Sequence, residues 1–154
     1  LEGELGRKVN LHDLEPLTMG FAHQYFNGGK ERMMPAAMQL MKVAVAIREK
    51  TGEYDAVLSP VLSSPPPVIG EQSPSMPFDK VMERMTAYVA YTPLYNVTGQ
   101  PAMSVPLTWS PAGLPIGSQF AAGMGDEGTL LALAYELEEA RPWAGKWAPL
   151  SAMG

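Results

Sequence analysis

Two histidines are the residues of this sequence best suited to acid–base or metal chemistry, and neither has a suitable neighbour along the chain. His12 and His23 have no second histidine one helical turn away and no acidic cluster beside them. A metal site needs three or four ligands, usually from His and Cys, and the sequence has no cysteine. We therefore predict no metal site and no cofactor, and we expect both histidines to be surface or helix-packing residues.

The serines also form no recognisable nucleophile site. Ser63 and Ser64 precede the three prolines 65–67, in a segment typical of a loop. Composition leaves a Ser-His-Asp triad open, but the sequence has no Gly-x-Ser-x-Gly elbow. The run Gly28-Gly29-Lys30 lacks the spacing and the preceding strand of a phosphate-binding loop. The residues alone therefore predict no catalytic group in this chain.

The composition indicates a globular protein whose partners are neither nucleic acid nor membrane. The formal net charge is −5, with 46% hydrophobic and 18% charged residues. The 11 basic residues are scattered, whereas a nucleic-acid-binding face needs them clustered. No apolar stretch approaches the roughly twenty residues of a membrane helix. The absence of cysteine excludes disulfides and agrees with a reducing compartment, so we expect a cytoplasmic location.

Glycine and proline residues divide the chain into seven expected elements. Asp13 and Asp126 are expected N-caps, Asn27-Gly28-Gly29 is expected to stop the first helix, and Pro35 is acceptable only in the first turn of the second. The third helix is expected to have an apolar side made of Val81, Met85, Tyr88 and Val89. The periodicity predicts helices over 13–26, 34–50, 78–91 and 126–140, and strands over 54–59, 102–107 and 114–121.

This order of elements predicts the α/β class, as a partial mixed β-sheet with flanking helices. The last two strands are expected to form a hairpin around Ser110-Pro111-Ala112-Gly113, which brings Gln119 onto one face of the sheet. Three strands are few for a self-sufficient sheet. The segment therefore has the character of part of a larger sheet.

Three stretches in this order resemble the carboxyl-terminal third of the amidase signature family. They are YDAVLSP with PPPVIG (54–60 and 65–70), NVTGQPAMSVP (96–106) and GLPIGSQF (113–120). The resemblance covers 54–143, with 1–53 as a helical lead-in, so residues 1–154 are expected to form a single carboxyl-terminal segment of the amidase-signature fold. Within the family, Asn-Val-Thr-Gly-Gln-Pro and Arg141-Pro142-Trp143 are similar to bacterial hydrolases of linear or cyclic amides, of the 6-aminohexanoate-cyclic-dimer hydrolase type.

The resemblance implies an amide hydrolase that uses a nucleophilic serine, activated by a second serine and a lysine. No lysine and Gly-Ser-Ser-Gly-like run in this chain can take these roles, so the chain alone is expected to be catalytically inert. In relatives the helix before the Asn-x-x-Gly turn lines the substrate pocket. Here the corresponding residues are Thr86, Val89 and the following Pro93, a small apolar wall suited to an aliphatic or aromatic amide. The competing interpretation is that Val89 simply packs in the core.

Three interpretations of function remain open. The first is a segment of an amide hydrolase, which acts on a small-molecule amide in its full-length parent. The second is a non-enzymatic binding module that works through its sheet edge, and the third is a purely structural fragment. The methionines of the second helix suit either a gap-filling core or a partner-binding surface. Because an isolated segment would expose a sheet edge and an apolar face, we expect it to self-associate. The methionines concerned are Met33, Met34, Met38 and Met41.

Overall fold

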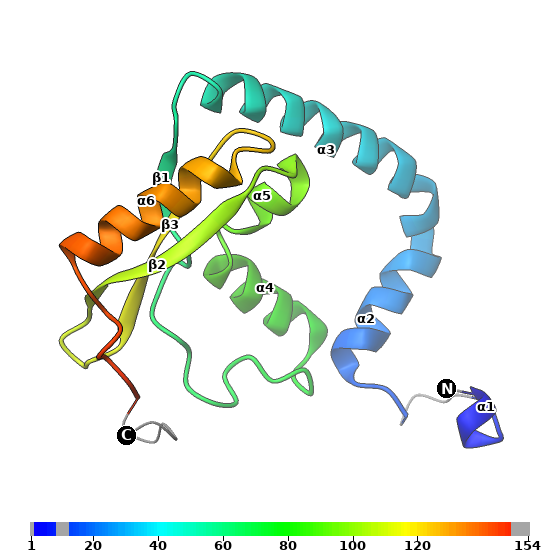
Figure 1. Cartoon of the computed structure of the whole chain (residues 1–154). Helices are drawn as coiled ribbons and strands as arrows, with labels where there is room; N and C mark the ends of the chain where they lie inside the picture. Colours follow the sequence, from blue (N-terminus) through cyan, green and yellow to red (C-terminus); the bar gives the residue numbers. More distant parts are fainter. Residues whose placement is uncertain (1, 9–12, 149–154) are drawn as a thin grey trace. The chain divides into compact units, whose positions relative to one another are not determined.

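The computed structural model describes residues 2–8 and 13–148 (Figure 1). The chain forms two compact units, one made of Leu1–Gln39 with Pro66–Tyr88 and the other of Leu40–Pro65 with Val89–Gly154. Helices and a three-stranded sheet are both present, which confirms the predicted class. The expectation that 1–154 is one segment of a larger domain stays a prediction.

The first unit is helical. α2 begins at Pro16, which suits the first helical position because proline has no N–H to leave unpaired. Asp13 therefore does not cap this helix, and the expected cap is wrong. Its carboxylate instead accepts two hydrogen bonds of 2.6 Å from Arg7, which raise the pKa of the Arg7 guanidinium above its ordinary value. The elements of this unit are α1 (Glu2–Leu5), α2 (Pro16–Gln24), η1 (Tyr25–Gly29), the first part of α3 (Lys30–Thr51) and α4 (Phe78–Tyr88).

The expected helix stop at Asn27-Gly28-Gly29 is a kink between two helices. Gly28 has φ +86°, in the left-handed region that glycine tolerates, and a π-helical turn joins α2 to α3. The second helix consequently begins at Lys30 and not at residue 34. Pro35 then lies beyond the first turn, where its missing N–H costs one intrahelical hydrogen bond. The prediction that this proline is confined to a first turn was wrong.

The second unit contains the sheet. Its strands are β1 (Val57–Pro60), β2 (Ala102–Trp109) and β3 (Pro115–Ala121), in the order β1-β3-β2. Both pairings are antiparallel, so the described sheet is antiparallel and not mixed. The predicted hairpin joins β2 to β3, and Ser110 N–H donates to the carbonyl of Leu114 at 2.8 Å across its turn. An irregularity in β2 between Pro106 and Thr108 interrupts the register.

A short helix that periodicity did not predict precedes β2. α5 (Pro93–Thr98) buries Tyr95 and Thr98, and the expected helix over 78–91 ends earlier, at Tyr88. Gly99 follows α5 with φ +72°, and its N–H donates to the carbonyl of Tyr95 at 2.9 Å. The glycine therefore ends the helix in the left-handed conformation and directs the chain into β2.

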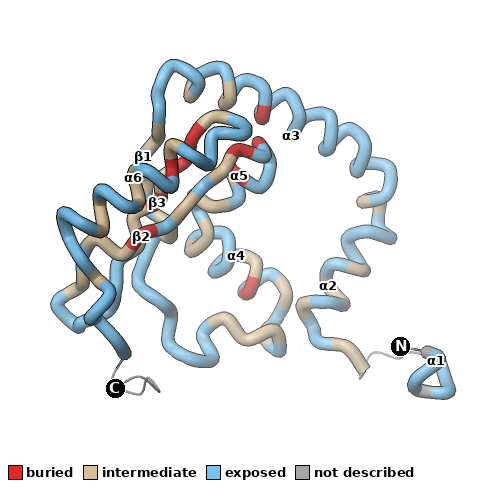
Figure 2. Tube along the Cα trace, in the orientation of Figure 1, coloured by how far each residue is buried: buried red, intermediate tan, exposed pale blue. Residues whose placement is uncertain are grey.

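α6 (Glu127–Ala140) lies against β2 (Figure 1). The predicted cap at Asp126 is confirmed, because its carboxylate accepts hydrogen bonds from the N–H and the hydroxyl of Thr129, at 3.4 and 2.8 Å. Figure 2 shows the buried positions, which within the described residues concentrate in this second unit. Its buried apolar side chains are Ala44, Tyr95, Val105, Ala121, Ala122 and Leu130.

Candidate functional site

The three residues predicted to line a substrate pocket do not share one helix. Thr86 lies in the last turn of α4 and is exposed. Val89 follows the end of that helix and is half-buried, and the exposed Pro93 begins α5. A helix continued through Pro93 would bring its ring against the carbonyl four residues earlier. The three residues therefore do not form one face of a single helix, and their substrate-binding role stays a prediction.

Thr86 does line a groove within the first unit. The groove has a volume of about 590 Å³. One lining residue is the last residue of α2, and the other six belong to α4. Its lining residues are Gln24, Phe78, Asp79, Met82, Glu83, Thr86 and Ala87.

The six lining residues on α4 share one side of that helix because of their spacing. They form two adjacent rows with i, i+4, i+8 spacing, one starting at Phe78 and the other at Asp79. The apolar side expected for this helix is another row, and Val81 of that row is indeed fully buried, at 0% exposure. This i, i+4, i+8 spacing alone does not predict the groove, because every α-helix has rows of this kind.

One aromatic contact fixes the end of the groove. The rings of Phe21 on α2 and Phe78 on α4 meet edge to face, with centroids 5.2 Å apart and an interplanar angle of 86°. Gly20 permits this close approach, because a Cβ atom at that position would lie 2.0 Å from Cδ2 of Phe78. In the same unit, Leu17 N–H donates to the carbonyl of Pro74 at 3.2 Å. α2 thus holds both α4 and the Pro-rich segment that precedes it.

The groove has an apolar wall and polar edges. Phe78, Met82 and Ala87 supply carbon surface, and the Thr86 hydroxyl can donate or accept one hydrogen bond. Glu83 pairs with Lys80 at 3.0 Å on the exposed side of α4, where such a pair contributes little stability. The groove thus combines carbon surface, one hydroxyl and the carboxylates of Asp79 and Glu83, and no serine is among the described residues that line it.

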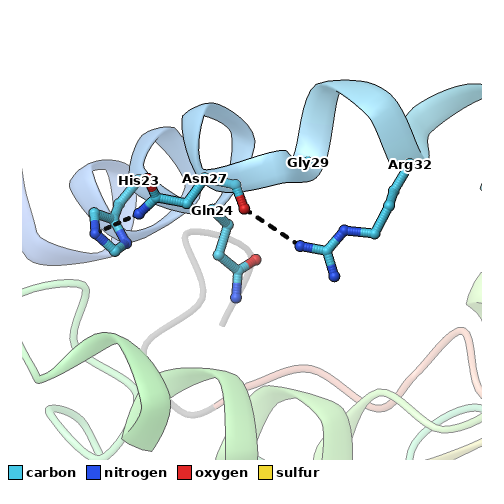
Figure 3. A pocket seen from close by; sticks show the side chains of 5 residues that line it. All are labelled: His23, Gln24, Asn27, Gly29 and Arg32. Carbon is cyan, nitrogen blue, oxygen red and sulfur yellow. Dashed lines mark hydrogen bonds between the residues drawn. The ribbon is translucent and has the colours of Figure 1, made fainter.

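A second hollow, of about 330 Å³, lies at the kink between α2 and α3. His23, Gln24, Asn27, Gly29 and Arg32 line it, as Figure 3 shows. Asn27 donates from Nδ2 to Nε2 of His23 at 2.7 Å, and Arg32 donates from Nε to the carbonyl of Gly28 at 2.9 Å. These polar side chains are exposed and largely hold the kink itself. His23 is thus a surface residue, as expected, whereas His12 lies outside the described residues.

The second unit contains a buried polar network. Gln119, predicted to lie on one sheet face, is 4% exposed, and its Nε2 donates to the hydroxyl of Ser59 on β1 at 3.4 Å. Gln100 is 7% exposed, and its Nε2 donates to Thr51 Oγ1 and to the carbonyl of Ala122, both at 3.1 Å. Oε1 of Gln100 is buried without a hydrogen-bond partner in the described chain.

Metal-ligand clusters and membrane-spanning helices are both missing from the part of the chain that the structure describes. Across 2–8 and 13–148, no three His, Asp or Glu side chains gather in a way that could hold a metal ion. Among the helices in these ranges, none combines the length and apolar character needed to cross a bilayer.

The sequence matches one protein family and is similar to several known proteins. The profile of the family described as Amidase matches residues 14–131. The amidase AmiC of Mycobacterium leprae (strain TN) is 41% identical over 139 residues, which are 90% of this chain and 29% of that protein. The 6-aminohexanoate-cyclic-dimer hydrolase of Paenarthrobacter ureafaciens is 36% identical over 100 residues, covering 60% of this chain and 20% of the hydrolase.

Solved structures agree with the sequence comparisons. A structure of 6-aminohexanoate cyclic dimer hydrolase superposes with a TM-score of 0.78 and 25% identity, over 92% of this chain and 31% of that one. A component of the glutamyl-tRNA(Gln) amidotransferase from Thermotoga maritima, at 23% identity and a TM-score of 0.55, shares the fold. The chain thus spans about three tenths of the length of these two proteins and of AmiC.

Proposed function

The chain belongs to the amidase family, and from this premise we propose that it is the carboxyl-terminal part of a serine-dependent hydrolase of amide C–N bonds. In this role it supplies sheet scaffold and one wall of the substrate pocket, and it is catalytically inert alone. The substrate is a small linear or cyclic amide. The absence of cysteine supports a reducing compartment, and we propose the cytoplasm.

One observation carries this proposal. The likeness to 6-aminohexanoate cyclic dimer hydrolase extends over nearly the whole chain and yet covers less than a third of that hydrolase. A nucleophilic serine needs an activating base and an oxyanion site within hydrogen-bond reach. No serine is among the described residues that line the α4 groove, which supports a division of labour in which the nucleophile comes from the rest of the fold.

The α4 groove is our candidate for the pocket wall. Thr86, with Phe78 and Met82 in the same row, presents one hydroxyl within carbon surface. Such a wall favours a neutral aliphatic or aromatic group over an anionic one, because the carboxylates of Asp79 and Glu83 beside it repel negative charge. We propose that Thr86 contacts the substrate, with Val89 and Pro93 shaping the segment that follows α4.

An amide-hydrolysis assay with a covalent probe tests the proposal. Two proteins are compared, this chain alone and a chimera in which it replaces the matching part of Mycobacterium leprae AmiC. Both are offered linear, aryl and cyclic amides and then a serine-directed probe, with labelling read by intact mass. We expect turnover and labelling of the chimera only. Labelling within this chain when it is alone would overturn the assignment of inertness.

The alternative is a non-enzymatic binding or self-associating module that retains the amidase fold. The exposed side chains of α3 favour it, because Met34 and Met41 are 71% and 70% exposed and large apolar patches are uncommon on monomers. The isolated chain would then form oligomers and bind a hydrophobic dye. A monodisperse monomer that binds no dye contradicts this alternative.

A further inference from the structure

In its last turns, from Ala44 to Thr51, α3 has one side packed within the second unit. Ala44 is 2% exposed, and Thr51 accepts the hydrogen bond from Gln100 while donating its own to the carbonyl of Ile47 at 2.9 Å. Positions 44, 47 and 51 have i, i+3, i+7 spacing, so they lie on one side of the helix. This side is the inner face of α3.

A second apolar face on the same helix is exposed. Met34, Met38, Met41 and Val45 have i, i+4, i+7, i+11 spacing, which places them in one stripe about a quarter to a third of a turn from the inner face. Their exposures are 71, 58, 70 and 48%. Figure 2 shows α3 pale blue along most of its length. We call these four residues the α3 stripe.

The carboxyl-terminal half of the stripe borders a hollow. Around Met41 and Val45, with Lys42, Ala46 and Glu49, there is a shallow hollow of about 430 Å³. Its centre is apolar, and its rim carries one positive and one negative side chain. This pattern of an apolar centre within a polar rim is typical of protein–protein contacts, and unbranched methionine adapts to an irregular partner.

The length of the relatives indicates what covers the stripe. In the structurally similar hydrolase, the matched part is 31% of one continuous chain, so about 69% (100 − 31) lies outside the match. A partner connected in the same polypeptide has an effective concentration of about the millimolar range. A second copy of this segment competes poorly with such a partner at ordinary protein concentrations.

We propose that the part of the α3 stripe that belongs to the second unit, Met41 and Val45, is the surface on which the remaining portion of the amidase fold packs. This inference rests on the proposed function, because it takes the rest of that hydrolase as the partner. It adds the place of contact. The inner face of α3 packs against other elements of this chain, whereas this part of the stripe packs against the remaining portion of the amidase fold.

A binding experiment tests the stripe separately from activity. This chain is mixed with the separately produced remainder of Mycobacterium leprae AmiC, and association is measured by analytical ultracentrifugation. The test variant carries Met41→Glu and Val45→Glu. Val43→Glu is the matched control, because Val43 lies on the same helix, is 39% exposed, and points about half a turn away from the stripe. Circular dichroism of each variant reports whether α3 remains helical.

We expect the wild-type chain and Val43→Glu to associate with the remainder, and the double variant to bind at least about 10-fold more weakly with unchanged helicity. Equal binding of the double variant overturns the proposal, as does a failure of the wild-type chain to bind. A homodimer that the remainder does not dissociate also overturns it, in favour of a second copy. An assembly that binds as expected but hydrolyses no amide leaves the stripe supported and refutes the proposed function.

Discussion

The side-chain amide of Gln100 donates a hydrogen bond to the hydroxyl oxygen of Thr51, 49 positions earlier, at 3.1 Å. The same nitrogen donates to the carbonyl of Ala122 at 3.1 Å. One buried side chain thus connects the end of α3, the entry to β2 and the exit from β3. The two accepting oxygens fix the orientation of the amide, which leaves Oε1 as the buried atom without a partner in the described chain.

Gln100→Ala should destabilise the chain by about 1–3 kcal/mol, because the buried carbonyl of Ala122 loses a donor. Urea unfolding at a fixed protein concentration measures the change in the free energy of unfolding. Gln24→Ala is the control, since Gln24 is exposed and its loss should stay within about 0.5 kcal/mol. Equal unfolding midpoints for Gln100→Ala and wild type contradict a structural role for this amide.

Gly20→Ala should destabilise the packing of α2 against α4, although alanine normally favours a helix. The new Cβ would lie 2.0 Å from the Phe78 ring, and overpacking of this kind costs about 1–3 kcal/mol. Gly128→Ala on α6 is the matched control, because nothing lies within 4 Å of a Cβ there. That control should be neutral or stabilising by up to about 1 kcal/mol. Thermal unfolding compares the two, and a stabilised Gly20→Ala variant is the contrary result.

Much of the fold was predictable because local signals determine it. The hairpin follows from turn residues between two apolar runs, and the start of α6 follows from Asp126 before an apolar helix face. At the α2–α3 kink the sequence predicts a helix end, because Asn27-Gly28 is typical both of a helix end and of a kink. Only tertiary context decides whether a helix resumes at once. α5 was missed because six residues are too few to show a period.

The candidate site was less predictable than the fold. The place of Thr86 in a family-like segment points to this residue. Its neighbours depend on the contact between α2 and α4, and the sequence does not show that these two distant segments meet. The methionines were expected to be core or partner-binding surface, and in this structure they are exposed. Composition cannot separate those cases, because the same apolar stripe serves a core or an interface.

Asp126→Ala should cost about 0.5–2 kcal/mol of stability, because the first turn of α6 loses the acceptor for the Thr129 N–H. Asp126→Asn keeps an acceptor at the same place and should retain most of that stability. Chemical unfolding of the two variants beside wild type measures the difference. If both variants lose the same stability, the carboxylate charge near the helix N-terminus matters more than the hydrogen bond.

Thr86→Trp tests the α4 groove as part of the substrate pocket, and it must be made where the rest of the amidase fold is present. The larger side chain should fill the groove between Gln24 and Ala87. For amides with a bulky aliphatic or aryl group, we expect KM to rise by about 10-fold or more with a smaller change in kcat, as for a loss of ground-state binding. Met85→Trp is the control, since Met85 is on the same helix but does not line the groove. If the two variants change KM alike, or neither does, then Thr86 is not part of the pocket wall, and the assignment of the groove to substrate binding is wrong.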